Sequence, residues 1–298
     1  MHTKVFTAFV KFSTILVIIK INLHSTFKYF KHIMLYRAFF ILFIFVFSFG
    51  VFGFQQTNMW QNKENIQNLI KERSWVDSVI NTMTREEKIG QFFTASVYTN
   101  KDNTHKQEIY SLIKEHHVGG LLFFKGHPTT QANWVNGFQQ SSKIPLMVSI
   151  DGEWGINMRL DSTIKYPRQL TLGAIQDNQL IYEMGKRIAE ECKITGININ
   201  LAPVVDVNNN PNNPVINDRS FGEDKYNVPL KGLAYMQGMQ DENVMAVGKH
   251  FPGHGDTDAD SHKTLPVINH TRERLDDIEL YPFNTLFANN IIGIMAAH

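Results

Sequence analysis

Short apolar runs alternate with amphipathic segments along the chain from Trp75 onward. Six of the runs are rich in Val, Ile, Leu and Phe and have the length of buried strands. The predicted strands cover residues 91–97, 118–124, 146–150, 197–205, 244–249 and 292–297. The predicted helices between them include residues 106–117, 131–141, 180–193, 228–242 and 272–289. Repeated strand–helix units of this kind predict an α/β fold with a parallel sheet covered by helices.

A further helix is predicted before the first strand, because Thr84-Arg85-Glu86-Glu87 has the form of a capping box. In such a box the threonine hydroxyl and the glutamate carboxylate each accept a hydrogen bond from a backbone N–H that the first helical turn leaves without a partner. We therefore predict that the main domain covers residues 84–298, after a linker and helix over residues 55–83.

Polar side chains follow several of the predicted strands, at the point where each strand ends. The third strand leads into Asp151-Gly-Glu-Trp-Gly155, the fourth into Asp206 and an Asn-rich loop, and the fifth into Lys249-His250. A TIM barrel builds its active site at the carboxyl ends of its parallel strands. Six strands are fewer than the eight of a closed barrel, and His298 directly follows the sixth. We therefore predict an incomplete (β/α)8 TIM-barrel type fold with about six βα units.

The first fifty-four residues differ in composition from the rest of the chain. Met34-Leu-Tyr-Arg37 precedes an uncharged apolar run over residues 38–54, with Gly50 and Gly53 near its end. This is the pattern of a secretory signal peptide, and a run at the short edge of bilayer-spanning length leaves an uncleaved N-terminal membrane anchor as the alternative. We predict a leader over residues 1–54, with translation starting at Met34, and an exported protein in the periplasm or outside the cell.

The overall composition is that of a soluble globular enzyme. Hydrophobic residues make up 43% of the chain and charged residues 19%, which allows a large core. The net charge of +1 gives no electrostatic bias toward nucleic acid, so we expect no nucleic-acid partner. Cys192 is the only cysteine, which excludes an intramolecular disulfide and a thiolate metal cluster. We predict that Cys192 is buried.

The loop after the fifth predicted strand concentrates groups that can do chemistry. Residues 249–257 read Lys-His-Phe-Pro-Gly-His-Gly-Asp-Thr, and Asp260-Ser-His262 follows closely. A core could not bury so many titratable groups without partners, and Gly253 and Gly255 allow the backbone to fold back on itself. This pattern is typical of a catalytic loop at the end of a strand.

Four motifs in this order resemble family 3 glycoside hydrolases, specifically the β-N-acetylglucosaminidase branch. The resemblance runs from about Thr84 to His298. The motifs are Asp151-Gly-Glu-Trp-Gly with Arg159, Asn200-Leu-Ala-Pro-Val-Val-Asp206, Arg219-Ser-Phe-Gly, and Lys249-His-Phe-Pro-Gly-His-Gly-Asp-Thr with Asp260-Ser-His262. The resemblance implies a retaining hydrolase that removes terminal non-reducing β-linked N-acetylglucosamine from oligosaccharides or peptidoglycan fragments. It implies no cofactor and no metal.

The resemblance also implies roles for individual residues. His262 is implied as the acid/base, with Asp260 as the carboxylate that orients it. An imidazole with an ordinary pKa of about 6.5 can protonate the leaving oxygen and later accept a proton from water. The residues implied to bind the terminal sugar are Asp151, Arg159, Arg219, Lys249 and His250. The family's nucleophile is an aspartate after the seventh strand, so we expect it beyond His298 and expect this fragment to be inactive alone.

Two other functions stay open at this point. The first is a metal-dependent barrel hydrolase, because carboxylates and imidazoles are the usual ligands of zinc and iron. Its ligands would come from His250, His254, His262, Asp256, Asp258 and Asp260. The second is a non-catalytic sugar-binding protein. In addition, Trp154 replaces the glycine usual in its motif, and we expect it to narrow the pocket or to stack on a sugar face.

Overall fold

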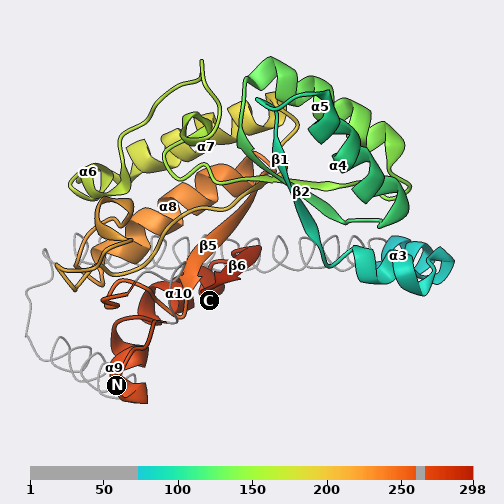
Figure 1. Cartoon of the computed structure of the whole chain (residues 1–298). Coiled ribbons are helices and arrows are strands. Elements are labelled where there is room, and N and C mark those ends of the chain that lie inside the picture. Colours follow the sequence, from blue (N-terminus) through green and yellow to red (C-terminus); the bar gives the residue numbers. More distant parts are fainter. Residues whose placement is uncertain (1–72, 260–265, 298) are drawn as a thin grey trace, which may run out of the picture. The chain divides into compact units, whose positions relative to one another are not determined.

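The computed structural model describes residues 73–259 and 266–297 (Figure 1). The chain divides into two units, Met1–Thr82 and Met83–His298. In the first unit the described residues 73–82 are helical. The predicted leader, Asp260 and His262 lie outside the described residues. None of the helices in the described part is long and apolar enough to cross a membrane.

The second unit is built on a six-stranded sheet whose strands are all parallel and follow one another in chain order. A barrel has this sequential order, whereas a doubly wound sheet reverses its strand order at a switch point. The described part therefore has the predicted α/β architecture of TIM-barrel type with six strands. The strands are β1 Thr94–Tyr98, β2 Gly120–Lys125, β3 Met147–Ile150, β4 Ile199–Asn200, β5 Met245–Phe251 and β6 Gly293–Ala296.

Helices form the connections between successive strands and cover the sheet (Figure 1). The neighbouring helices α7 and α8 pack closely because glycines lie at their contact. A Cβ atom on Gly238 would collide with the carbonyl oxygen of Tyr182, so only glycine fits there. The helices are α3 Arg85–Gly90, α4 Asn103–Glu115, α5 Pro128–Ser141, α6 Gln169–Gly173, α7 Asn178–Ile194, α8 Asn227–Asp241, α9 Arg272–Asp277 and α10 Tyr281–Ala288, with short 3-10 turns η1 Ile156–Met158 and η2 Asn217–Arg219.

The predicted capping box at the start of α3 is confirmed. The Thr84 hydroxyl accepts from the Glu87 N–H at 3.1 Å, and the Glu87 carboxylate accepts from the Thr84 N–H at 2.9 Å. The first strand, in contrast, was predicted to begin three residues too early. Residues 91–93 close α3 instead, because the N–H of Phe92 donates to the carbonyl of Ile89.

Two other predicted elements differ from the structure. Of the strand predicted over residues 197–205, only Ile199–Asn200 forms a regular ladder, because Pro203 has no N–H to donate. The helix predicted over residues 272–289 is divided into α9 and α10. Pro282 explains the division, since its ring would clash with the carbonyl four residues earlier in a continuous helix.

The core lies between the sheet and the helices. Cys192 on α7 is part of it and is fully buried, as predicted. Burial raises the pKa of its thiol, so the thiolate needed for reactivity is not formed at neutral pH. Other fully buried core side chains include Val97, Leu121, Phe138, Ile150, Ile188, Tyr235, Met239 and Phe283.

Glu191 on α7 is a carboxylate whose Oε2 is buried and has no hydrogen-bond partner within the described part of the chain. Burial raises its pKa from the ordinary 4.5 to about 7. Between pH 4.5 and about pH 7 the folded state therefore keeps a proton that the unfolded state loses. The contribution of this difference to the free energy of unfolding is fully present below pH 4.5 and is lost as the pH rises through about 7.

Glu191→Gln is expected to raise the melting temperature at pH 8 and to change it little at pH 4, as measured by thermal unfolding. The glutamine stays neutral at every pH and thus removes the unfavourable ionisation. Glu190→Gln is the matched control, because Glu190 already pairs with Arg187 at the surface. An equal gain for Glu191→Gln at both pH values would contradict the prediction.

Candidate functional site

A cavity of about 430 Å³ opens at the carboxyl ends of the strands. Its polar lining comes from the segments that follow β3 and β4 and from the end of β5. All five residues that the sequence predicted to bind a sugar line this cavity. Its lining residues are Leu122, Asp151, Glu153, Met158, Arg159, Leu201, Val215, Arg219, Lys249, His250, His254, Met295, Ala296 and Ala297.

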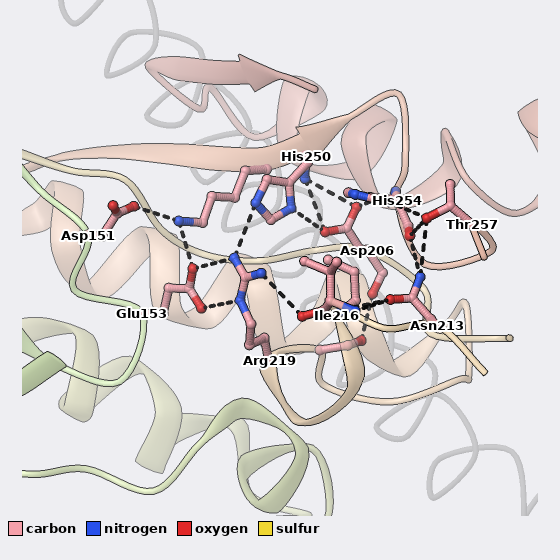
Figure 2. A network of polar contacts seen from close by, with 12 residues as sticks. Asp151, Glu153, Asp206, Asn213, Ile216, Arg219, His250, His254 and Thr257 are labelled. Atoms are coloured by element: carbon pink, nitrogen blue, oxygen red, sulfur yellow. Dashed lines mark hydrogen bonds and ion pairs between the residues drawn. The ribbon is translucent and has the colours of Figure 1, made fainter. Parts of the chain in front are cut away.

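Oppositely charged side chains alternate along the cavity (Figure 2). Lys249 is only 2% exposed, and its Nζ lies 2.9 Å from Asp151 Oδ1 and 2.8 Å from Glu153 Oε1. Arg159 Nη2 donates to the other oxygen of Asp151 at 2.8 Å. Arg219 holds Glu153 with two bonds, from Nε at 2.9 Å and from Nη2 at 2.7 Å. Each buried charge thus has an opposite partner, as burial of ions requires.

These pairs determine the protonation of the two carboxylates after β3. Burial would raise the pKa of Glu153, but Lys249 and Arg219 outweigh burial and lower it to about 2. For Asp151, burial is outweighed by Lys249 and Arg159, which hold the pKa below its usual range. Both groups are therefore ionised at neutral pH and act as acceptors only.

His250 is held between a carboxylate and a guanidinium. Its Nδ1 lies 2.7 Å from Asp206 Oδ2, and its Nε2 lies 3.3 Å from Arg219 Nη2. Arg219 can only donate, so Nε2 accepts and Nδ1 carries the proton. Both nitrogens of the ring are therefore engaged.

Asp206 is fully buried and orients the His250 ring. Its carboxylate also accepts from the backbone N–H of His250 at 3.2 Å and of His254 at 2.7 Å. Burial would raise the pKa of Asp206, but the His250 ring and these N–H groups hold the pKa below its usual range.

The turn that carries Asp151 and Glu153 is braced by two buried residues. The side chain of Asn200 accepts from the N–H of Gly152 at 2.8 Å and donates to its carbonyl at 3.1 Å. The hydroxyl of Tyr235 on α8 donates to the same carbonyl at 2.8 Å. The strand β4 and the helix α8 therefore fix the direction in which both carboxylates project.

The sequence motifs assign no role to Glu153 or Asp206, although both residues follow predicted strands. Their roles depend on contacts with Arg219, Lys249 and His250, which are distant in sequence. Trp154 is not among the residues that line the cavity. Its ring lies instead beside the guanidinium of Arg168, at 4.4 Å from the ring centroid.

The described residues contain no group of three or more histidine, cysteine, aspartate or glutamate side chains placed to hold a metal ion. Of the histidines considered as ligands, His250 uses both nitrogens in hydrogen bonds and His254 uses Nδ1 with Thr257. The aspartate Asp256 is bonded to His270 at 2.6 Å. Within the described ranges, these side chains are therefore bonded to different partners and do not converge on one point.

Comparison with known proteins identifies the family. Residues 84–298 match the family described as Glycosyl hydrolase family 3 N terminal domain. The chain is 36% identical over 205 residues to Beta-hexosaminidase A of Pseudoalteromonas piscicida, covering 64% of this chain and 34% of that protein. It is 35% identical over 198 residues to Beta-hexosaminidase LpqI of Mycobacterium tuberculosis, covering 63% of this chain and 49% of that protein.

A solved structure gives the same result. The family 3 β-N-acetylglucosaminidase from Paenibacillus sp. str. FPU-7 superimposes with a TM-score of 0.67 at 39% identity, covering 73% of this chain and 42% of that one. The chain spans about a third to a half of the length of these relatives. The profile match over most of the chain, the sequential parallel sheet and the cavity lined by the four motifs agree, and the chain belongs to glycoside hydrolase family 3.

Proposed function

We propose that the whole protein hydrolyses terminal non-reducing β-linked N-acetylglucosamine and retains the configuration at the anomeric carbon. In this proposal Asp151, Arg159, Arg219, Lys249 and His250 bind the terminal sugar, and His262 is the acid/base with Asp260 as its orienting partner. Relatives with about 35% identity carry the name beta-hexosaminidase, which supports the choice of sugar.

The observation that carries the proposal is the charge network in the cavity. Carboxylates and cations that converge from several strand ends offer the directional, charge-assisted hydrogen bonds that pyranose hydroxyls require. Because the pairs already neutralise one another, the cavity suits a polar but uncharged ring. A sugar fits this description better than a phosphate or a free carboxylate does.

The same network favours a proton donor outside it. Both nitrogens of His250 are engaged, so it has no proton to give to a leaving oxygen without breaking its bond to Asp206. Of the other two histidines of the motif, His254 is bonded through Nδ1 to Thr257, and the nearby Asp256 is bonded to His270. His262, with Asp260 two residues before it, is the candidate that is left, and a general acid of this type is expected near neutral pH.

In the first step His262 protonates the glycosidic oxygen as the bond from that oxygen to the anomeric carbon breaks, and a carboxylate attacks the carbon. In the second step water, deprotonated by His262, displaces that carboxylate. Glu153 and Asp206 are poor candidates for the nucleophile, because each accepts at least three hydrogen bonds or ion pairs. We propose that an aspartate outside the described residues supplies it.

The test is hydrolysis of p-nitrophenyl β-N-acetylglucosaminide by the whole protein, with the matching β-glucoside as the comparison. We expect turnover of the first at a much higher kcat/KM, with the β-anomer as the first product in proton NMR. Binding without turnover would favour the sugar-binding alternative. Loss of turnover on treatment with a metal chelator, restored by zinc or iron, would favour the metal-dependent alternative.

The proposed substrates are peptidoglycan fragments or chitin oligosaccharides, which both end in β-linked N-acetylglucosamine. We further propose that the protein is exported, on the basis of the signal-like residues 34–54. Comparing release of N-acetylglucosamine from muropeptides and from chitobiose separates the two glycans.

A further inference from the structure

One polar atom at the cavity stands outside the charge network. His254 lines the cavity and is 2% exposed, yet its Nε2 has no hydrogen-bond partner within the described ranges. Buried polar atoms in native proteins are nearly always paired with protein, water or ligand. An unpaired nitrogen on a residue that lines a cavity therefore points to a group that enters the cavity.

The His254 ring is held rigidly from its other nitrogen. Its Nδ1 makes a short hydrogen bond with the hydroxyl of Thr257. The amide nitrogen of Asn213 donates to that hydroxyl at 3.4 Å and to the carbonyl of His254 at 2.7 Å. The amide oxygen of Asn213 accepts from the N–H groups of Val215 and Ile216, which sets the orientation of the amide (Figure 2).

The ring is also placed beside the proposed sugar-binding residues. Its backbone N–H donates to Asp206 at 2.7 Å, and its ring meets that of His250 edge to face, with centroids 6.1 Å apart. Thr257, which holds Nδ1, is not among the cavity-lining residues, whereas His254 is.

The ring is neutral, because burial lowers the pKa of His254. A neutral imidazole has a donor on one nitrogen and an acceptor on the other. The Thr257 hydroxyl can accept from Nδ1 when Nδ1 carries the proton and can donate to Nδ1 when it does not. Nε2 is the acceptor in the first case and the donor in the second. A sugar hydroxyl can do both and is therefore a suitable partner for either tautomer.

We propose that His254 is a further sugar-binding residue, whose Nε2 forms a hydrogen bond with one hydroxyl of the bound pyranose. This inference rests on the proposed function. The His254 imidazole would be a neutral contact beside the five sugar-binding residues already proposed, and Thr257 and Asn213 keep it in position. The sequence motif by itself had placed His254 only among the candidate metal ligands.

The test is isothermal titration calorimetry with N-acetylglucosamine and its 3-, 4- and 6-deoxy analogues, on the wild-type whole protein and on His254→Phe. Phenylalanine keeps a flat ring and removes both nitrogens. Loss of one neutral hydrogen bond is expected to weaken binding of N-acetylglucosamine by about three- to tenfold. The analogue that lacks the hydroxyl bonded to His254 should bind wild type and variant equally, because it has no hydrogen bond to lose in the variant. His270→Phe, outside the cavity lining, is the control.

The outcomes separate this inference from the proposed function. If the wild type binds N-acetylglucosamine and His254→Phe weakens every analogue by the same factor, or none, the inference is wrong and the proposed function stands. If the wild type binds no N-acetylglucosamine, both fail.

A second measurement covers the case in which His254→Phe does not fold. The nitrogen NMR signals of the histidine rings are recorded in the wild type, and those of His254 are assigned by their change in Thr257→Val. Saturating N-acetylglucosamine should shift the Nε2 signal of His254. An unchanged signal would overturn the inference.

Discussion

His262→Ala is expected to slow the hydrolysis of glycosides with poor leaving groups by about 10²–10⁴-fold in the whole protein, the usual contribution of general acid catalysis. An alkoxide leaving group needs a proton as the glycosidic bond breaks, whereas an activated phenolate leaves with little protonation. The first step on a dinitrophenyl glycoside should therefore suffer much less. Pre-steady-state kinetics on chitobiose and on the dinitrophenyl glycoside measures the two losses.

Two controls make this prediction specific to His262. His270→Ala removes a histidine that is bonded to Asp256 and does not line the cavity, and it should leave both rates nearly unchanged. Asp260→Asn should move the pH profile as well as the rate, because the carboxylate is proposed to stabilise the protonated ring. Equal losses on both substrates for His262→Ala would show that the residue is not the acid.

Lys249→Met is expected to lower the free energy of unfolding by about 3–5 kcal/mol at neutral pH, the typical loss when one member of a buried ion pair is removed. The methionine fills the space of the lysine stem but leaves Asp151 and Glu153 without their shared cation. The difference from wild type should narrow as the pH falls below about 4.5, because the two carboxylates that have lost Lys249 then take up protons. Denaturant unfolding at several pH values measures this effect.

A double variant separates the effect of Lys249 on stability from its effect on sugar binding. In Lys249→Met with Glu153→Gln, the lost cation is matched by a lost carboxylate, so part of the stability should return. Binding of N-acetylglucosamine should stay weaker by about 10–100-fold, since a charge-assisted hydrogen bond contributes about 1.5–3 kcal/mol. Lys193→Met, which breaks a surface pair with Glu242, is the control and should cost less than about 1 kcal/mol. Sugar binding at wild-type strength in Lys249→Met would place the sugar elsewhere.

The elements that could be predicted from the sequence are those whose signal is local. The apolar runs that became β2, β3, β5 and β6 were placed to within one or two residues at most ends, because buried parallel strands are nearly continuous apolar segments. The capping box needs only residues 84–87 and was correct for the same reason. The limits of β4 were wrong because its ladder depends on the hydrogen bonds that its neighbours can form around Pro203.

The location of the site also followed from the sequence, since parallel strands bring their carboxyl ends to one edge. The partners within the site did not. Lys249 lies between Asp151 and Glu153, although Asp206 and Asp256 are nearer to it in the chain. Asp206 pairs with His250 instead.

The order and register of β3, β4 and β5 decided these pairs. Ile150 lies opposite Asn200, and Asn200 lies opposite Ala246, so the segments that follow β3 and β5 extend over the same cavity from opposite sides of β4. Lys249 and Asp151 are 98 positions apart in the chain. The sequence by itself determined which residue types stand at the strand ends, because the apolar runs that predict the strands and the polar residues that follow them are adjacent in the chain. Only the tertiary structure decided which charges meet and which nitrogen of His254 is bonded to Thr257, because polar pairing depends on distances of a few ångströms that the register of the sheet sets.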